Sequence, residues 1–431
     1  MSSSELAVFA YLPGEAAAVP AGLLTLEEEG AVPQGADFVY GLRYLDRPDA
    51  IEIDPVSLSL HDREAARGVR LHPVAGLALF GAIRDAAPDA WGRRVIEARR
   101  KVPLNSLPES EYLLAAGSNR VGALDVRAGL DAGETAGELG DVRKLDYFLE
   151  AVHRIEEGLP VPARLEAFFD AGSALGGARP KATVADADGK LWLAKFPSRG
   201  DGYDVPVVEA ATLKLANAAG LTVPRIEMVD VGEGRHVMLI ERFDRAGVVG
   251  ALSRRHFISA LTLVGCPEQD SPNRNYADIA DALRKFGAAR RLAADLEELF
   301  ARMVFNILVS NDDDHLRNHG LLWEPDARAW TLSPLYDVVP RPTQAKERFL
   351  HLGIGPQGRL ATLSNAMGWA ARFGLTHDKA RATIDRVWRV VREWKNRFEE
   401  YGVPAAQIDK VGSAFRHARE IGGPGSGTYS A

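Results

Sequence analysis

The spacing of apolar residues in the first third of the chain indicates strands followed by helices. Residues 6–60 alternate apolar and polar positions between turns that contain glycine and proline, and this period of two predicts a β-rich unit of short strands. From Leu77 the apolar residues recur at helical spacing, and an arginine-rich stretch follows at 89–94. We therefore expect a mixed N-terminal domain, which a glycine-rich linker at 129–142 separates from the rest.

The middle of the chain predicts the order strand, strand, helix, strand. Residues 181–184 and 191–196 are short apolar runs on either side of an Asp-Gly pair at 188–189, which is the pattern of a β-hairpin. Residues 207–219 follow a helical pattern, and 236–241 form another continuous apolar run.

The last third of the chain is mainly helical in pattern. Between 292 and 308 apolar residues recur at the i, i+3, i+4, i+7 spacing, which predicts a helix buried on one face. Residues 378–401 predict a further amphipathic helix. The glycine- and serine-containing tail from Gly422 is expected to be flexible.

The composition is that of an ordinary globular protein. The chain has 431 residues, of which 46% are apolar and 26% are charged, and these values exclude a disordered chain and a coiled-coil rod. A formal net charge of -7 argues against non-specific binding of nucleic acid through the whole surface. A local basic patch remains compatible with that charge.

Three features indicate where the protein resides. The single cysteine, Cys266, has no partner for a disulfide or a thiolate metal site, and we interpret it as a core thiol. No basic residue precedes Arg43, so the positive region of a secretory signal is missing. The uncharged stretch at 71–83 is shorter than the ~20 residues that span a bilayer. We expect a cytoplasmic protein.

An acidic loop after the helix at 292–308 is the strongest candidate for chemistry. Asp313 and Asn318 are separated by four residues, and Asp337 follows in an apolar run that we take for a strand. Phosphoryl transfer requires a base at the acceptor hydroxyl, together with an Asn and a second Asp that hold Mg²⁺ on the phosphates. Aspartate clusters after helices are also common as solvated turns, so the loop alone leaves both interpretations open.

A lysine on a strand is the second candidate. Lys195 lies among apolar residues, where a lysine either protects a sheet edge or binds phosphate. Glu209 opens the next helix, and a strand lysine paired with a helix glutamate positions the nucleotide phosphates in kinases. Glu209 is equally compatible with a favourable interaction with the helix dipole.

A glycine-containing loop at 172–181 precedes the lysine strand. Glycines permit a close approach of the backbone to phosphate, and Arg179 and Lys181 supply positive charge. The loop lacks the Gly-Lys-Ser/Thr of a Walker motif and the dinucleotide fingerprint. A plain flexible loop is the alternative.

Five ordered motifs together resemble the HipA family of bacterial toxin serine/threonine kinases. The motifs are Gly176–Lys181, Ala194–Pro197, Ile240–Arg245, Asp313–Asn318 and Pro334–Val338. The stretches 85–94 and 117–124 look like the N-terminal subdomain of that family, so the resemblance covers nearly the whole chain.

The resemblance implies an α+β, protein-kinase-like bilobal fold with a small mixed β/α N-terminal subdomain and a largely helical C-terminal lobe. The expected parts are a HipA-like subdomain at 1–130, an N-lobe-like region at 145–250, a helical C-lobe at 251–421 and a flexible tail at 422–431.

The resemblance also implies a role for individual residues, with ATP and Mg²⁺ as cofactors. Asp313 matches the catalytic base, and Asn318 and Asp337 match the magnesium ligands. The nucleotide-binding positions are Gly176, Gly177, Ala178, Arg179, Lys181, Lys195, Glu241, Phe243, His315 and Tyr336. Among them, Glu241 and Phe243 match the hinge that holds adenine in the family.

Members of the family act beside a small helix-turn-helix antitoxin of the HipB type, reach DNA only through it, and phosphorylate proteins that include an aminoacyl-tRNA synthetase. The loop serine that the family autophosphorylates falls at Ala174 here, which leaves Ser173 as the alternative site. Two other functions remain open, a small-molecule phosphotransferase and a non-catalytic corepressor that binds the antitoxin. The N-terminal domain carries no catalytic constellation, and we assign it to scaffolding or partner contact.

Overall fold

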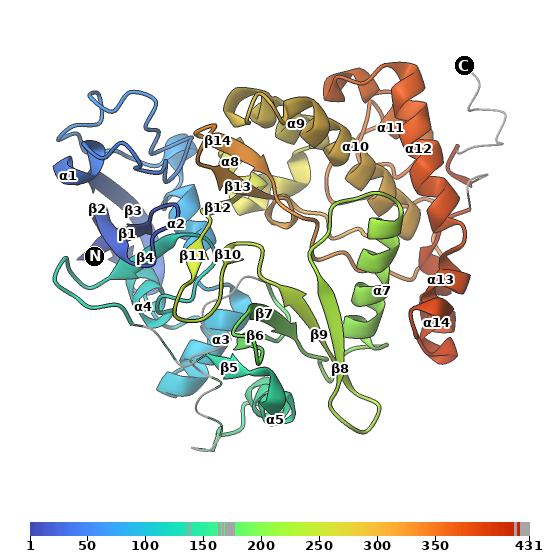
Figure 1. Ribbon diagram of the computed structural model, residues 1–431, viewed down its shortest axis with the longest axis horizontal. Helices are drawn as coiled ribbons and strands as arrows, with labels where there is room; N and C mark the ends of the chain where they lie inside the picture. The colour runs from blue at the N-terminus through green and yellow to red at the C-terminus, as the bar shows by residue number, and fades with distance from the viewer. Residues whose placement is uncertain are drawn as a thin grey trace. The chain divides into compact units, whose positions relative to one another are not determined.

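The chain forms two compact units. The computed structural model describes residues 1–135, 137, 139–162, 165, 168, 177–417 and 420–422 (Figure 1). Unit 1 comprises Met1–Gly200 with Glu227–Ile258, and unit 2 comprises Asp201–Ile226 with Ser259–Ala431. Most of the tail expected from 422 onward lies outside the described residues.

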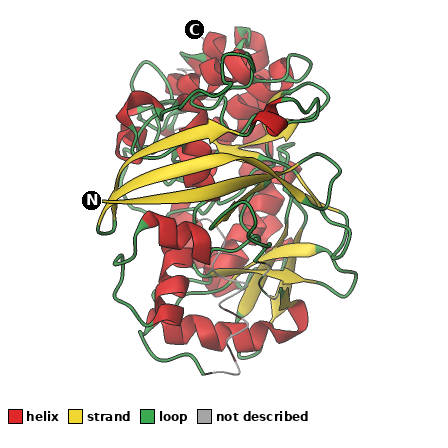
Figure 2. Ribbon diagram, turned by 90° about the vertical axis from the view of Figure 1, so that its left-hand side faces the viewer, coloured by secondary structure: helices red, strands yellow, loops and turns green. Residues whose placement is uncertain are grey.

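Unit 1 contains a four-stranded antiparallel sheet in the order β3-β2-β1-β4. Its long strands are drawn in yellow in Figure 2. Its strands are β1 (Ser2–Tyr11), β2 (Ala18–Glu29), β3 (Val32–Tyr40) and β4 (Leu124–Arg127). The β-rich prediction is therefore confirmed up to residue 40, but the expectation of short strands is wrong, because β1, β2 and β3 have 10, 12 and 9 residues. Residues 41–60 contain no long strand, because the Asp54 carboxylate binds the N–H groups of Val56 and Ser57 and turns the chain.

Short helices follow the first sheet and pack into the rest of unit 1. They are α1 (Leu42–Leu45), α2 (Gly81–Ala86), α3 (Ala90–Arg100), α4 (Glu109–Ala115) and α5 (Leu145–Glu156). Asp89 caps α3 by accepting from the N–H of Gly92 at 2.9 Å. Trp91 of α3 and Phe148 of α5 share a buried apolar cluster with Trp192, so these helices belong to the core of the next sheet.

The second sheet of unit 1 has five strands in the order β5-β6-β7-β9-β8. The strands are β5 (Gly140–Asp141), β6 (Lys181–Ala185), β7 (Leu191–Lys195), β8 (Ile226–Asp230) and β9 (His236–Glu241). The hairpin between β6 and β7 is confirmed, and Gly189 supplies its turn with a φ of +79°. The linker predicted at 129–142 is wrong at its end, because Gly140 and Asp141 pair with β6.

A small hairpin joins β10 (Arg245–Ala246) to β11 (Ser253–Arg254) in unit 1. The chain passes into unit 2 within β12 (Phe257–Ser259).

Unit 2 is mainly helical and is built around α10, which packs against α9, α11 and α12 (Figure 1). The helices are α7 (Val205–Ala218), α8 (Ala260–Val264), α9 (Tyr276–Phe286), α10 (Leu292–Val309), α11 (Leu363–Met367), α12 (His377–Val391), α13 (Trp394–Glu400) and α14 (Ala405–Val411). A hairpin of β13 (Gly320–Glu324) and β14 (Ala329–Leu332) follows the acidic loop. The helices predicted at 207–219 and 292–308 are thus confirmed.

Single 3-10 turns complete both units. They are η1 (Val74–Gly76), η2 (Val142–Lys144), η4 (Glu268–Asn273), η5 (Leu316–Asn318), η6 (Ala370–Phe373) and η7 (Gly412–Ala414).

Two predictions of local structure are wrong. The single helix expected at 378–401 is two helices, because α12 ends at Val391 and the indole of Trp394 stacks on Phe415 at 3.9 Å between ring centroids. The strand expected around Asp337 is absent from the structure, and a φ of +58° at that residue is incompatible with extended backbone.

Two further predictions bear on the core and on membranes. Cys266 is fully buried, as expected of a core thiol. No helix among the described residues is long and apolar enough to cross a bilayer.

Candidate functional site

The acidic loop of unit 2 begins at the end of α10. Ser310 ends that helix in a left-handed conformation with a φ of +51°. The N–H of Asn311 still donates to the carbonyl of Asn306 at 3.0 Å, and η5 closes the loop on the other side. Both ends of the loop are therefore fixed by main-chain structure.

The three adjacent carboxylates of this loop occupy different environments. Asp312 and Asp313 are half exposed and both face Arg341, with N–O distances of 2.9 and 2.8 Å. Burial raises the pKa of Asp312, although Arg341 opposes that shift. Asp314 points inward and is fully buried. Arg341 pairs with two of the carboxylates and the third is buried away from them. This arrangement relieves the repulsion that three neighbouring carboxylates would have in a solvated turn.

Asn318 turns back onto the residue predicted as the base. Its Nδ2 donates to the main-chain carbonyl of Asp313 at 2.7 Å, and its side chain is largely buried. The spacing of Asp313 and Asn318 in the sequence therefore has a structural cause, because four intervening residues allow this hydrogen bond to close a ring. The Asp313 side chain itself remains 52% exposed.

The other predicted residues of unit 2 lie around this ring. Nε2 of His315 is 3.9 Å from the Asp313 carboxylate. The Tyr336 hydroxyl donates to the carbonyl of Arg317 at 2.7 Å, which ties the 334–338 segment to the loop. Asp337 follows directly in a left-handed conformation, a strained state for a residue with a side chain and one that is enriched at functional sites.

The two predicted magnesium ligands, Asn318 and Asp337, both carry side-chain oxygens. No group of three or more His, Cys, Asp or Glu side chains in the described part of the chain could hold a metal ion. Because Nδ2 of Asn318 donates to Asp313, its Oδ1 is the atom available to a cation. An amide oxygen and the Asp337 carboxylate fit Mg²⁺, which commonly takes one or two protein oxygens and completes its shell with phosphates and water.

Asp314 anchors the acidic loop through its buried carboxylate, a role that sequence reasoning missed. Its carboxylate accepts from the hydroxyl of Tyr276 at 2.6 Å and from the N–H of His351 at 2.7 Å. The Tyr276 hydroxyl in turn accepts from Nδ2 of Asn306 at 2.9 Å. Burial raises the pKa of Asp314 to about 7, against these two donors. The sequence signal was the Asp next to the predicted base, but nothing local shows that it is buried.

Replacing Tyr276 with Phe is expected to destabilise the chain in a pH-dependent way. In the wild type the pKa of the Asp314 carboxyl is raised to about 7, so its neutral form favours the folded state. This contribution to stability is lost as pH rises through that value. Without the tyrosine donor the ionised form is worse solvated, so its pKa rises further. The loss of unfolding free energy should reach about 1–3 kcal/mol at about pH 8 and be smaller at about pH 5.

Urea unfolding at both pH values measures this effect, with Tyr44→Phe as the matched control. Tyr44 is equally buried, but its hydroxyl donates to the carbonyl of Ile51 at 2.9 Å. Loss of the Tyr44 hydroxyl should lower the free energy of unfolding by the same amount at both pH values. Equal losses at both pH values for Tyr276→Phe would contradict the assignment of Asp314 as the titrating partner.

Lys195 lies at the end of the central strand of its sheet in unit 1. β7 is the third of five strands and pairs with β6 and β9, so Lys195 does not protect a sheet edge. The residue is 5% exposed and stands opposite Lys181 in the register. Two lysines facing each other on neighbouring strands concentrate positive charge at one end of the sheet, as a phosphate site requires.

The described end of the glycine loop approaches α3. Lys181 is 3.6 Å from the Asp89 carboxylate, and the Trp91 ring N–H donates to the carbonyl of Lys181 at 3.1 Å. Gly177 has a φ of +109°, and a Cβ there would lie 2.0 Å from Nζ of Lys181. The positive φ favours glycine at this position, whereas the flexible end of Lys181 could move away from a Cβ. Ala178 and Arg179 follow in a bend, while Ser173, Ala174 and Gly176 lie outside the described residues.

Glu241, one of the two predicted hinge residues, lines a cavity at the end of β9. Glu241 is the last residue of this strand, and the Phe243 ring lies 6.3 Å from that of Phe257. A cavity of about 230 Å³ is lined by Glu241, Leu191 and the turn that follows β9. Glu209 lies on α7 and is buried, but it belongs to unit 2, so its pairing with Lys195 stays a prediction.

Comparison with known proteins defines the class of this fold. It is a mixed α/β fold shared with HipA of Shewanella oneidensis MR-1, a structure solved in complex with HipB and its operator DNA. The similarity has a TM-score of 0.63 at 15% identity and covers 94% of each chain. The family model of the HipA-like C-terminal domain matches residues 173–394. The chain belongs to the HipA family, as the motifs predicted.

Two proteins of Sinorhizobium fredii are similar in sequence. The protein named "Putative kinase Y4dM" is 30% identical over 230 residues, which cover 48% of this chain and 54% of that protein. The protein named "Putative kinase Y4mE" is 27% identical over 284 residues, which cover 59% of this chain and 64% of that protein. The chain thus spans between half and two thirds of the length of these relatives.

Proposed function

We propose that the chain is an ATP-dependent serine/threonine protein kinase and the toxin of a toxin-antitoxin module. The observation that carries the proposal is the closed loop in which Asn318 holds the main chain of Asp313 and leaves its carboxylate exposed. A carboxylate held in this way can accept the proton of a hydroxyl. Membership of the HipA family and the names of the two relatives support the same function.

The proposed mechanism gives each of the predicted residues a role. Asp313 accepts the proton of a serine or threonine hydroxyl as that oxygen attacks the γ-phosphate. Lys195 and Lys181 neutralise the nucleotide phosphates, and Glu241 and Phe243 hold the adenine. Bound Mg²⁺ would be held by Asn318 and Asp337 and would neutralise charge on the phosphates. The bilobal kinase arrangement implied by the family resemblance belongs to this proposal.

The proposed partners are a protein substrate and an antitoxin of the HipB type. The similar structure from Shewanella oneidensis contains HipA, HipB and operator DNA. The fold similarity to that HipA extends over 94% of both chains, which supports a partner of the same type. Any contact with DNA is proposed to be indirect, through the antitoxin, in accord with the net charge of -7.

Replacing Lys195 with Ala is expected to weaken ATP binding by about tenfold or more, because the phosphates lose a buried counter-charge. Equilibrium titration of the full-length chain with Mg-ATP measures this. Lys144→Ala is the control, since Lys144 is an exposed lysine of the same unit. Equal affinities of the two variants would remove Lys195 from the site. A wild-type chain that binds no ATP would favour the non-catalytic corepressor instead.

A further inference from the structure

The hinge motif Ile240–Arg245 contains three charged residues to which sequence reasoning gave no role. Arg242, Asp244 and Arg245 are buried, whereas Glu241 and Phe243 are only half buried. The segment 242–245 forms a turn, closed by the N–H of Arg245, which donates to the carbonyl of Arg242 at 3.2 Å. Alternate residues of one short motif therefore face different environments.

The Asp244 carboxylate is the centre of this buried cluster. It accepts two bonds from Arg242, at 3.0 and 2.7 Å, one from Arg245 at 2.8 Å and one from the N–H of Gly122 at 2.8 Å. Burial acts to raise the pKa of Asp244, but the attraction of both arginines outweighs burial and holds that pKa far below its ordinary value. The carboxylate is thus ionised and fully hydrogen-bonded.

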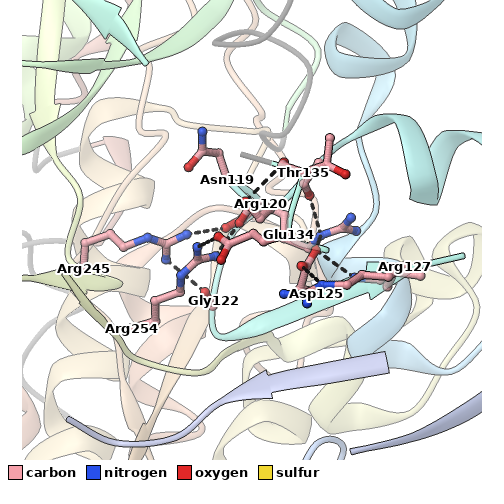
Figure 3. A network of polar contacts seen from close by, with 12 residues as sticks. Asn119, Arg120, Gly122, Asp125, Arg127, Glu134, Thr135, Arg245 and Arg254 are labelled. Carbon is pink, nitrogen blue, oxygen red and sulfur yellow. Dashed lines mark hydrogen bonds and ion pairs between the residues drawn. The ribbon is translucent and has the colours of Figure 1, made fainter. Parts of the chain in front are cut away.

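The two arginines extend from this turn to a loop of the N-terminal part, residues 117–122, which we call the clamp loop. Arg242 donates to the carbonyl of Asn119 at 2.9 Å, and Arg245 donates to those of Arg120 at 2.7 Å and Gly122 at 2.9 Å. Figure 3 shows the side chain of Arg245 directed at the main chain of this loop. Main-chain carbonyls of the clamp loop therefore accept hydrogen bonds from those guanidinium N–H groups that the single Asp244 carboxylate cannot reach.

Arg242 also links the hinge to the side of the sheet that is predicted to bind phosphate. Nη1 of Arg242 donates to the hydroxyl of Thr183 on β6 at 3.1 Å, and β6 begins at Lys181. The clamp loop approaches closely because Gly122 has a φ of +77°, where a Cβ would lie 3.0 Å from the N–H nitrogen of Phe257. A side chain at Gly122 would therefore press on the chain at Phe257 and disturb the clamp loop.

We propose that Arg242, Asp244 and Arg245 are positioning residues that hold the hinge main chain in the geometry that selects adenine. The clamp loop of the N-terminal part, in this view, completes the nucleotide site instead of serving as a scaffold. The inference rests on the proposed ATP-binding function and deepens it. A buried charge cluster suits this task, because removing one partner leaves the others unpaired and lets the turn move.

The test compares Asp244→Asn with Asp125→Asn in the full-length chain. Asp125 is as buried as Asp244 and lies in the same polar network, but its carboxylate pairs with Arg127 at 2.8 Å and Arg120 at 3.7 Å (Figure 3). Both variants lose a buried negative charge. Only Asp244→Asn removes the partner of the two hinge arginines.

The measured quantity is the ratio of the dissociation constants for GTP and ATP, from titration of each variant. The wild type should prefer ATP, Asp244→Asn should reduce that preference by about tenfold, and Asp125→Asn should keep it. A general destabilisation of unit 1 would weaken the binding of both nucleotides to the same extent and leave the ratio of their dissociation constants unchanged. An unchanged ratio in Asp244→Asn overturns the positioning role.

A second variant keeps the inference testable if Asp244→Asn does not fold. Arg242→Lys retains the positive charge but cannot reproduce the hydrogen bonds of the guanidinium, which reach Asp244, Thr183 and the carbonyls of Asn119 and Arg120. It should therefore reduce the ATP preference as well. Retention of the full preference in Arg242→Lys would contradict the inference. A wild-type chain that binds neither nucleotide overturns the proposed function itself, and one that binds both equally overturns adenine selection by the hinge.

Discussion

Asp313→Asn should reduce phosphoryl transfer by about 100- to 10,000-fold while leaving the fold intact. The amide cannot accept the proton of the attacking hydroxyl. The change should not disturb the loop, because Asn318 binds the main-chain carbonyl of Asp313 and not its carboxylate. Transfer of radiolabelled phosphate from ATP to a protein acceptor, with circular dichroism for the fold, measures both expectations.

Asp312→Asn is the matched control for this prediction. Asp312 is about as exposed as Asp313 and pairs with the same arginine, Arg341. It lacks the main-chain link to Asn318, so its loss should have a milder effect on the rate. If Asp312→Asn were the more damaging change, the assignment of the base would be off by one residue. Asp314 is no alternative base, because its carboxylate is buried against Tyr276.

Local patterns predicted the elements whose residues decide their own conformation. The hairpin of β6 and β7 follows from an Asp-Gly turn between two apolar runs, since Gly189 adopts the positive φ that such a turn needs. α10 follows from an apolar stripe that remains in register for five turns. In these cases short-range spacing and long-range packing favour the same structure.

Errors arose where contacts distant in sequence decided the conformation. The break between α12 and α13 accompanies the stacking of Trp394 on Phe415, which the helical periodicity of 378–401 does not encode. Asp337 lies in an apolar run typical of a strand, yet its backbone is left-handed. A positive φ at a residue with a side chain is held by its surroundings and leaves no mark in a periodicity.

The candidate site was predicted as motifs, but its supporting groups were not. Motif spacing placed Asp313 five residues before Asn318, and the hydrogen bond between them gives that spacing a physical meaning. The buried Asp314 and the hinge turn at Arg242–Arg245 depend on partners 37 to 125 residues away in the chain. Such partners cannot be inferred from one sequence, because any of its many arginines or tyrosines could fill the role.

Asp337→Asn is expected to lower the rate of phosphoryl transfer by on the order of 100-fold or more and to weaken the dependence on Mg²⁺. Asn tolerates the left-handed backbone of Asp337 as well as Asp does, so the φ of +58° need not change. The variant therefore removes one negative charge with little change in shape. A neutral amide oxygen binds a hard divalent cation less strongly than a carboxylate.

Titration of ATP with and without Mg²⁺ gives a measure that is independent of turnover. Magnesium should tighten ATP binding in the wild type and have a smaller effect in Asp337→Asn. Asp326→Asn is the control, because Asp326 is an exposed acidic residue in the turn between β13 and β14 of the same unit. If Asp337→Asn gained as much affinity from Mg²⁺ as the wild type does, Asp337 would not be a ligand, and its strained backbone would need another cause.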